Sequence, residues 1–430
     1  MISTELATTV IICSFLVSLG AYVWFSKREG TYLNLLVPSL VVSGPACYAL
    51  PWIYAQLFGV EASRYAFVYV YVTLAAETIA FVFGYALAKE RIVCLPFRFA
   101  YRNFTRSSLT CLGIGLLIYI PILLEFREYL LDPRQIYAQT RTGYGTQFYI
   151  SSILAYLAVI LILFTKRSWM TKAAVITVAT GLLLLHGSKG HVLNVILLLA
   201  LFYVYGAGKR AGFFRTVIAC SAIGLLVLLL FAGTMTLGDS SQEIIESISQ
   251  YSDYTRNAML VIDSHMPLQY GRLTMEANTL ALVPRVLMPN KPKNFGSMRL
   301  DDEFYPDELD ADAGAPAFGV GVQYADFGDF AILYVIFFSV LRGWLGRIFV
   351  NRLNFTHHPA DFFMVVFLAD VSLFPVGGLG WFLPGAFLMV IILRFTSAIS
   401  GKTTYRERRP ALPAGPDPPV FGPLNQSPNV

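Results

Sequence analysis

Long hydrophobic stretches alternate with short polar linkers along almost the whole chain. The apolar runs cover residues 7–26, 31–50, 65–88, 108–124, 148–165, 173–185, 192–206, 216–234, 322–341, 361–376 and 379–396. Because about 20 apolar residues cross one hydrocarbon core as a helix, the pattern predicts an all-α polytopic membrane protein with about eleven transmembrane helices. Residues 173–185 and 192–206 are too short for full spans, so a helical hairpin and a re-entrant pair both stay open.

The basic residues predict an orientation. Roughly two thirds of the 32 Lys and Arg lie in linkers that fall on one side if each run spans once. These linkers are residues 27–28, 89–106, 166–172, 209–215 and 342–352, with the tail from Arg394. Cytoplasmic loops carry excess Lys and Arg, so this side is predicted to be cytoplasmic and the N-terminus periplasmic. The first run lacks a basic leader and is interpreted as an anchor, not as a signal peptide.

Domain organisation follows from the same pattern. Residues 1–400 form one predicted transmembrane domain, and residues 401–430, rich in Pro and Gly, form a disordered cytoplasmic tail. Two outward, periplasmic segments are substantial, residues 125–147 and the large loop 235–321. Within the large loop, the helical spacing of apolar residues over 243–262 predicts an amphipathic helix on the membrane. Residues 280–289 are apolar but too short to span.

Composition limits the classes of partner and cofactor that are expected. Hydrophobic residues make up 56% of the chain and charged residues 14%, and the net charge of +5 is explained by linkers that face lipid headgroups. Membrane lipids are therefore expected partners, and nucleic acid is not. The five cysteines lie in or beside apolar runs, which argues against a disulfide framework or a thiolate metal site. No cofactor or metal is expected, and the acidic run 301–312 is interpreted as a solvated face.

The outward segments retain arginine, although translocating such charges is costly. Segment 125–147 holds Arg127, Arg134 and Arg141, and the large loop holds Arg256, Arg272, Arg285, Lys291, Lys293 and Arg299. Guanidinium groups bind phosphate bidentately, so a site built from both segments would suit an anionic, lipid-linked donor such as a polyprenyl pyrophosphate. Neighbouring acids favour simple ion pairing for Arg127 and Arg299. For Arg134, Arg141 and Arg285, binding and structural roles are equally supported.

Two acids lie inside apolar runs, Glu77 and Asp370. Ionisable groups within the membrane are costly and mark functional sites by default, which would suit a proton-coupled transporter. A hydrogen bond to a neighbouring helix would explain Glu77 equally well. The concentration of polar residues in the outward segments argues against transport.

Several motifs resemble Wzy-type O-antigen and oligosaccharide repeat-unit polymerases. The stretch Pro284-Arg285-Val-Leu-Met-Pro289-Asn-Lys291-Pro292, with Tyr270-Gly271 in the same loop, is similar to the Pro-Arg…Lys-Pro element of that family. Residues 319–328, Gly-Val-Gly-Val-Gln-Tyr-Ala-Asp-Phe-Gly, resemble its glycine-rich Tyr-x-Asn-Phe-Gly segment, with Asp326 in place of Asn and no further Gly at 329–331. Residues 187–190, Gly-Ser-Lys-Gly, resemble its Gly-Ser-Arg-Gly turn. The resemblance covers about half of the chain, from Glu125 to Arg352.

A spacing typical of some of these polymerases also occurs. An Arg followed by Gly after ten intervening residues is found at Arg134 to Gly145 and at Arg285 to Gly296. The spacing alone is weakly specific, because Arg102 to Gly113 also fits and begins on the side predicted to be cytoplasmic. It gains weight only with the outward location and the Pro-Arg…Lys-Pro element.

The resemblance implies a GT-C-like fold that joins undecaprenyl-pyrophosphate-linked oligosaccharide repeat units at the periplasmic face of the inner membrane. Arg285 and Arg134 would stabilise the pyrophosphate leaving group as catalytic residues. The expected substrate-binding residues are Arg141, Lys291, Arg272, Tyr270, Gly145 and Gly296. For a general base, His265, Glu276, Asp302 and Glu303 all stay open. A chain-length regulator and a flippase are the expected protein partners, and an O-antigen ligase or a flippase is the alternative function.

Overall fold

Helices form all the regular secondary structure of the described residues in the computed structural model. It describes residues 2–88, 101, 103–130, 136, 144–187, 189–232, 252–280, 283, 287–292, 294–306, 317–369 and 382–399, with the backbone alone at 42–43, 189, 225–232 and 382–387. Five helices of this part are long and apolar enough to cross a membrane, and five shorter apolar helices accompany them. These findings agree with the predicted all-α polytopic membrane protein.

The helices follow the predicted apolar runs closely in the first half of the chain. They are α1 (Thr4–Glu29), α2 (Val37–Ser43), the π-helix η1 (Gly44–Ala49), α3 (Leu50–Phe58), α4 (Arg64–Leu87), α5 (Phe104–Glu125), the short 3-10 helix η2 (Arg127–Tyr129), α7 (Gly145–Leu163), α8 (Trp169–Leu185), α9 (Lys189–Leu201), the π-helix η3 (Phe202–Gly206) and α10 (Phe213–Ala232). Side-chain caps begin several of them, as where Ser63 accepts a hydrogen bond from the Ala66 amide at α4.

The second predicted run is displaced along the chain. The sequence predicted a span over 31–50, whereas the helical segment begins at Val37 and continues through η1 and α3 to Phe58. Asn34 holds the preceding turn, because its side-chain oxygen accepts from the Leu36 amide and its amide nitrogen donates to Ser26 Oγ. Pro45 lacks an amide hydrogen, and the helix widens to a π-helix at this point.

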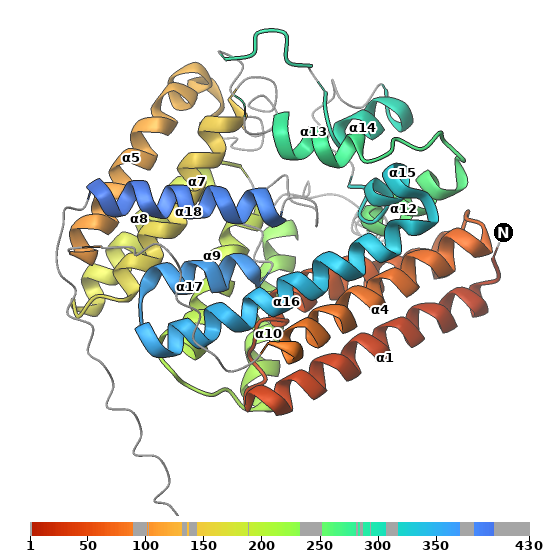
Figure 1. Ribbon diagram of the computed structural model, residues 1–430, viewed down its shortest axis with the longest axis horizontal. Coiled ribbons are helices and arrows are strands. Elements are labelled where there is room, and N and C mark those ends of the chain that lie inside the picture. Colours follow the sequence, from red (N-terminus) through yellow and green to blue (C-terminus); the bar gives the residue numbers. More distant parts are fainter. Residues whose placement is uncertain are drawn as a thin grey trace, which may run out of the picture.

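In the second half, four short helices precede the last long ones. The short helices are α12 (Asp253–Asp263), α13 (Arg272–Leu280), α14 (Met298–Phe304) and α15 (Gly321–Phe327). The 3-10 helix η5 (Gly328–Phe330), α16 (Ala331–Thr356), α17 (Pro359–Leu368) and α18 (Phe382–Ile399) follow them. Helix α12 overlaps the predicted amphipathic helix at 243–262, of which residues 243–251 lie outside the described residues. Figure 1 shows α12 to α15 together at one end of the molecule, beyond the long helices α1, α4 and α16.

Helix α16 extends through a segment that the sequence predicted to be a cytoplasmic linker. The predicted span ended at Leu341, but the helix continues to Thr356 and ends at His357, which adopts the left-handed conformation. The basic residues of this segment pair with acids of neighbouring helices: Arg342 with Glu77 (3.7 Å), Arg347 with Glu29 (2.9 Å) and Arg352 with Asp361 (2.9 Å).

These ion pairs account for two of the buried charged residues, Arg342 and Asp361. Arg342 is 8% exposed and its guanidinium also lies over the ring of Phe81. Glu77 therefore contacts a neighbouring helix, as the sequence analysis considered, and the contact is an ion pair between α4 and α16. Asp370 lies outside the described residues.

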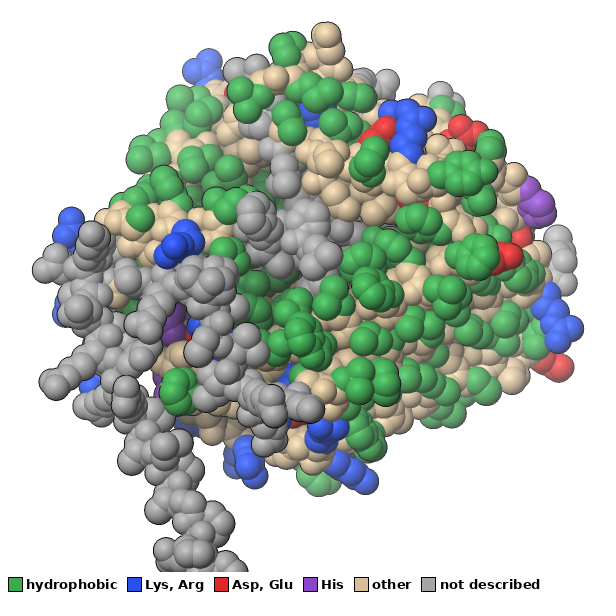
Figure 2. Space-filling model, in the orientation of Figure 1, with side chains coloured by type: hydrophobic (Ala, Val, Ile, Leu, Met, Phe, Trp, Pro, Cys, Tyr) green, Lys and Arg blue, Asp and Glu red, His purple; other side chains and the backbone are tan. Residues whose placement is uncertain are grey.

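The core is a set of helices wrapped around α7. Nearly all side chains of α7 are buried, and α5, α8 and α17 pack against it. Helices α1, α4 and α16 lie side by side and form a second group. Figure 2 shows a broad apolar surface over these three helices, in keeping with exposed Phe15, Leu16, Phe83 and Phe337. Such a surface is what a lipid-facing wall requires.

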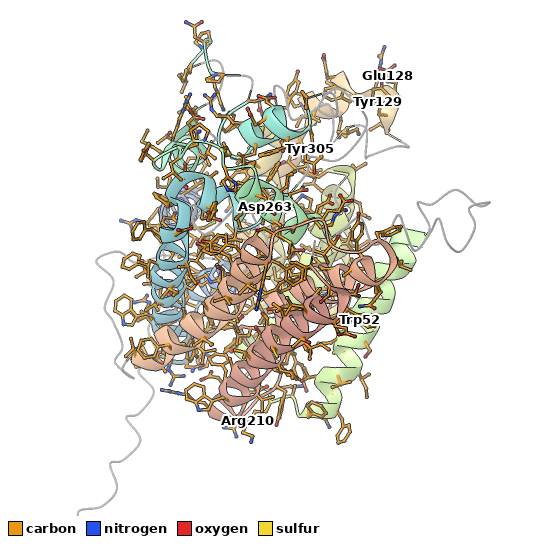
Figure 3. The ribbon with its side chains drawn as sticks, turned by 90° about the vertical axis from the view of Figure 1, so that its right-hand side faces the viewer. Trp52, Glu128, Tyr129, Arg210, Asp263 and Tyr305 are labelled. Carbon is orange, nitrogen blue, oxygen red and sulfur yellow. The ribbon has the colours of Figure 1, made fainter. Side chains whose placement is uncertain are left out.

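The two ends of the molecule differ in the residues they carry. Arg28 at the end of α1 donates to Ala86 O at the end of α4, and the Arg210 guanidinium lies beside Gly30. Figure 3 places Arg210 at one end and Glu128, Tyr129 and Tyr305 at the other. The described parts of the linkers 27–28 and 209–215 therefore share the end opposite to α14.

Candidate functional site

The described residues of the loop 235–321, which the sequence predicts to be outward, form a layer of short helices, α12 to α15, that the long helices support. Helix α12 packs against α4, η1 and α15, and α13 packs against α15. A small apolar core holds the layer together, formed by Val261, Leu273, Leu300, Phe318 and Ala325. The layer thus has a fixed base from which the loops of this end extend.

Asp326 fixes the start of α13. Its carboxylate accepts hydrogen bonds from the amides of Leu273 (2.9 Å) and Thr274 (2.7 Å), and its side chain is buried. Unpaired amide groups at a helix N-terminus carry partial positive charge, so a carboxylate suits them well. Asp326 stands where the resembled family usually has Asn, and its two carboxylate oxygens accept one bond each from these two amides.

Glu276 joins the two sides of the loop. Its carboxylate accepts from Arg272 Nε (2.9 Å), from Arg299 Nε (2.6 Å) and Nη2 (2.9 Å), and from the Gly296 amide (3.1 Å). Burial would raise the pKa of Glu276, but the hydrogen bonds from Arg299, Gly296 and Arg272 outweigh it and lower that pKa. The bond to Glu276 raises the pKa of Arg299. Glu276 is therefore a charged tether and a weak base.

Two expectations for this region are corrected. Arg299 forms an ion pair, as predicted, but its close partner is Glu276 and not the adjacent Asp301 or Asp302. Asp301 is 2% exposed, so the interpretation of 301–312 as a solvated acidic face is wrong at this residue. Asp302 accepts a hydrogen bond from Asn294, and residues 307–316 lie outside the described residues.

Gly296 has no room for a side chain. Its φ is +62°, and a Cβ atom would lie 2.9 Å from Ala277 Cβ. Its amide donates to Glu276, so the chain must approach α13 closely here. Gly145, the other glycine of the predicted spacing, is the first residue of α7 and has open space around it.

Lys291 ties the opposite part of the same loop. Its Nζ atom donates to Val283 O (3.1 Å) and lies 4.5 Å from the centre of the Phe295 ring. The segment that carries Arg285 is thus bounded by Val283 and Lys291, which are joined directly. Arg285, Arg134 and Arg141 themselves lie outside the described residues.

Tyr270 stands out at the start of α13. Its side chain is 86% exposed, and its backbone adopts a left-handed conformation with φ of 50°, which is unusual for a residue other than Gly. Arg272, two residues further on, is half exposed and paired with Glu276. The structure thus brings Arg272 and Gly296 together around Glu276, with Tyr270 at the edge of the same helix.

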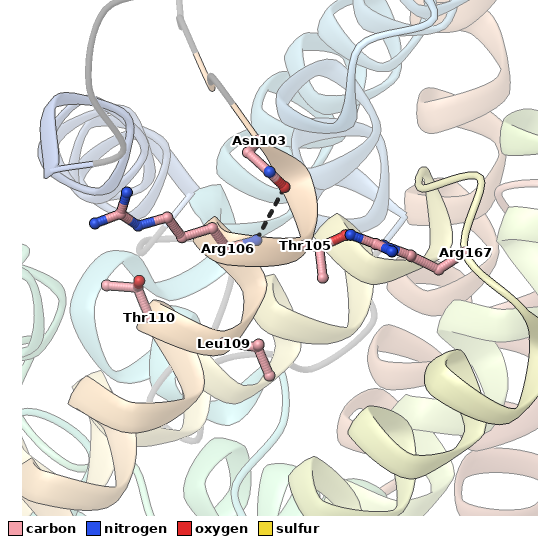
Figure 4. A pocket seen from close by; sticks show the side chains of 6 residues that line it. All are labelled: Asn103, Thr105, Arg106, Leu109, Thr110 and Arg167. Carbon is pink, nitrogen blue, oxygen red and sulfur yellow. Dashed lines mark hydrogen bonds between the residues drawn. The ribbon is translucent and has the colours of Figure 1, made fainter.

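A pocket of about 390 Å³ lies elsewhere, at the start of α5. Asn103, Thr105, Arg106, Leu109, Thr110 and Arg167 line it, and Asn103 accepts from the Arg106 amide (Figure 4). Four of these residues come from the linkers 89–106 and 166–172, which the sequence predicts to be cytoplasmic, and Leu109 and Thr110 come from the start of the run that follows the first linker. The pocket is therefore separate from the outward layer.

Comparison with known proteins identifies the family. The chain is 33% identical to the O-antigen polymerase of Salmonella typhimurium over 374 residues, which cover 86% of this chain and 91% of that protein. The O-antigen polymerase of Salmonella typhi matches to the same extent. The chain belongs to the O-antigen polymerase family. No protein-family model and no solved structure matches it.

Membership of the O-antigen polymerase family confirms the resemblance drawn from the Pro-Arg…Lys-Pro element. The sequence did not reveal the tether at Glu276, which it ranked only among possible bases. Helical spacing brings Arg272 and Glu276 together, four residues apart, and was a usable signal. No comparable signal indicated the contact between Glu276 and Arg299, which is 23 residues away.

Proposed function

We propose that this protein polymerises lipid-linked oligosaccharide repeat units into O-antigen at the periplasmic face of the inner membrane. The similarity to two O-antigen polymerases over 86% of the chain carries the proposal. A glycosyltransferase of this kind attaches an acceptor hydroxyl to the anomeric carbon of the donor glycan. The bond from that carbon to the pyrophosphate breaks, and the lipid pyrophosphate leaves.

The finer features belong to the same proposal. The donor is an undecaprenyl-pyrophosphate-linked oligosaccharide, the fold is GT-C-like with about eleven spans, and the N-terminus is periplasmic with the C-terminus cytoplasmic. A chain-length regulator and a flippase act with the protein. Orientation is testable by cysteine labelling with an impermeant maleimide in spheroplasts, which should modify Glu61→Cys and leave Lys209→Cys unmodified.

The tethers around Glu276 support a role for Arg285 in this reaction. Arg285 lies in a short segment whose ends are joined through Lys291 and Val283, and whose continuation is held to α13 at Gly296. A guanidinium that stabilises a leaving group must be positioned before the reaction, because reorganisation then costs little. Arg134 supplies the second charge, and Arg141 and Lys291 support both.

The test is the glycan profile of a deletion strain complemented with wild type, Arg285→Ala or Arg285→Lys. We expect no polymer from Arg285→Ala although the protein accumulates, and little from Arg285→Lys, because a point charge does not replace the planar fork. Arg256→Ala is the matched control. That outward arginine is engaged with the Tyr54 ring (3.9 Å), so its loss should leave the ladder intact.

The strain without the protein separates the alternatives. Single repeat units on the final acceptor, with no ladder, indicate a polymerase. Long polymer that stays on the carrier indicates a ligase, and repeat units trapped on the cytoplasmic face indicate a flippase. A profile unchanged by the deletion would contradict all three, and polymer of normal length from Arg285→Ala would contradict the role of that residue.

A further inference from the structure

The turn between α8 and α9 lies inside the helix bundle. Tyr119 of α5 donates to Leu185 O at the end of α8 (2.7 Å), and the His186 ring stacks on Tyr119 with centroids 4.1 Å apart. Tyr119 is six residues before the end of α5, or about 9 Å along the helix. Irregular backbone at this depth is tolerated where protein buries it or where it lines a polar cavity.

His186 has partners for both ring nitrogens. Its Nδ1 atom lies 2.7 Å from Leu182 O, and its Nε2 atom lies 2.8 Å from Ser151 Oγ of α7. The side chain is fully buried. Its polar atoms are thus used within the protein, and His186 has a structural role.

His191 differs from it at one nitrogen. Its Nδ1 atom lies 2.7 Å from Tyr156 Oη, and Asn194 Nδ2 donates to the same Oη (3.4 Å). The phenol has two acceptors in reach, Nδ1 at 2.7 Å and His191 O at 3.5 Å. Donation over the shorter distance leaves Nδ1 without a proton of its own, and the imidazole then carries its proton on Nε2. His191 is 4% exposed, and Nε2 has no hydrogen-bond partner within the described residues. A buried donor without an acceptor is costly.

The position of His191 suits an anion. It is the third residue of α9, a helix of 13 residues whose first amide groups point toward the turn. A helix N-terminus attracts negative charge, and a neighbouring N–H donor adds a directional bond. Phe148 of α7 contacts both histidines, with ring centroids 4.5 Å from His186 and 6.0 Å from His191.

Phe148 also relates the turn to the outward segment. It lies in the first turn of α7, directly after the segment 125–147 that carries Arg134 and Arg141. The turn is therefore next to the point where that segment joins the bundle.

We infer that the N-terminal end of α9 receives the pyrophosphate group of the lipid-linked substrate, with the Nε2–H group of His191 donating to a phosphate oxygen. The inference rests on the proposed function and adds a binding residue for its donor. Tyr156 is a positioning residue, because it fixes the proton on Nε2. The polyprenyl chain would lie in the membrane beside the bundle.

Binding of undecaprenyl pyrophosphate to the purified full-length protein in nanodiscs tests the inference. In His191→Asn the amide replaces Nδ1 and keeps the contact with Tyr156, but no donor remains at the Nε2 position. We expect this variant to bind about tenfold to hundredfold more weakly, as for loss of a hydrogen bond to a charged group. In His191→Gln the amide nitrogen reaches the Nε2 position, so affinity should stay within about threefold of wild type.

His358→Asn is the matched control. His358 caps α17 by accepting from the Ala360 amide, and Asn is an equally good cap, so binding should not change. Undecaprenol, which lacks the anion, should bind wild type and His191→Asn equally. Inorganic pyrophosphate should compete in wild type and much less in His191→Asn, which would assign the recognition to the anion and not to the lipid tail.

Wild-type affinity in a folded His191→Asn variant would overturn the inference alone. Failure of the wild type to bind undecaprenyl pyrophosphate would overturn the inference together with the donor in the proposed function. Should His191→Asn not accumulate, Tyr156→Phe takes its place. It keeps His191 but releases the proton to either nitrogen, and affinity equal to wild type would again contradict the inference.

Discussion

Two glycines allow α4 and α16 to approach each other closely. A Cβ atom on Gly343 would lie 2.0 Å from Phe81 O, and one on Gly84 would lie 1.9 Å from Val340 O. Both contacts are with backbone, which cannot rotate away. Three residues further along α16, a Cβ atom on Gly346 would have its nearest neighbour, Leu35 Cδ1, at 3.5 Å, which is ordinary van der Waals contact. Gly343→Ala and Gly346→Ala thus form a matched pair three residues apart.

The expected free energies of unfolding can be estimated. Alanine favours a helix over glycine by about 1 kcal/mol, and both variants gain this term. For Gly343→Ala, ordinary contact requires at least 3.4 Å, so the helices must separate by more than an ångström. Overpacking of this kind costs about 1–3 kcal/mol, and more where backbone is involved. The separation also weakens the Arg342–Glu77 pair between the same helices. Gly343→Ala should be destabilised by about 2 kcal/mol relative to wild type, which leaves a gap of about 3 kcal/mol between the variants.

The assay is the fraction of monodisperse protein after heating in detergent, measured by size-exclusion chromatography over a range of temperatures. A gap of this size corresponds to midpoints about 5 °C or more apart. Gly346→Ala should match or exceed wild type. Equal midpoints for the two variants would refute the close approach of α4 and α16.

Three further predictions concern the layer formed by α12 to α15. Asp326→Asn should increase amide hydrogen exchange in the first turn of α13, because one carboxamide oxygen replaces the two carboxylate oxygens that accept from Leu273 and Thr274. Hydrogen exchange with mass spectrometry measures this change, and unchanged protection would contradict the cap. Glu276→Gln should destabilise the layer by about 1–2 kcal/mol, a value discounted for the partial exposure of both arginines. It should also lower the polymer yield, because the Arg285 segment would be misplaced. A normal glycan ladder together with normal amide hydrogen exchange in α14 would contradict the tether. The pKa of Glu276 is lower in the folded protein, so its contribution to stability is complete above the unfolded pKa of about 4.3 and is lost as the pH falls through the folded pKa. Protease sensitivity of the α13–α14 loop should therefore rise only in that acid range. In Glu276→Gln this pH dependence should be absent.

Hydrophobic pattern predicted most of the membrane-embedded helices because burial in lipid demands long apolar runs. The ends of α4, α5 and α7 agree with it to within a few residues. The pattern failed at α16, since it treats each arginine as an end of a span. Arg342 and Arg347 are neutralised by Glu77 and Glu29, and such pairing across helices leaves no trace in local hydropathy.

For the candidate site, local signals in the sequence predicted the family but not the contacts. The Pro-Arg…Lys-Pro element indicated the O-antigen polymerase family because its residues are close in sequence, and the role of the retained arginines stays a prediction. The bond from Asp326 to α13 and the one from Arg299 to Glu276 join residues 53 and 23 positions apart. Such pairings depend on how the short helices pack, and no periodicity encodes them.

The charge pairs of α16 impose an order on biogenesis. Arg347 follows its partner Glu29 by 318 residues, so the acids of α1 and α4 enter the membrane long before the arginines that neutralise them are synthesised. During that interval the carboxylates of Glu29 and Glu77 lack the arginines with which they pair in the complete protein. A chain truncated before α16 would lack these arginines permanently. Membrane proteases that survey unpaired charge should therefore remove such fragments and spare the complete protein.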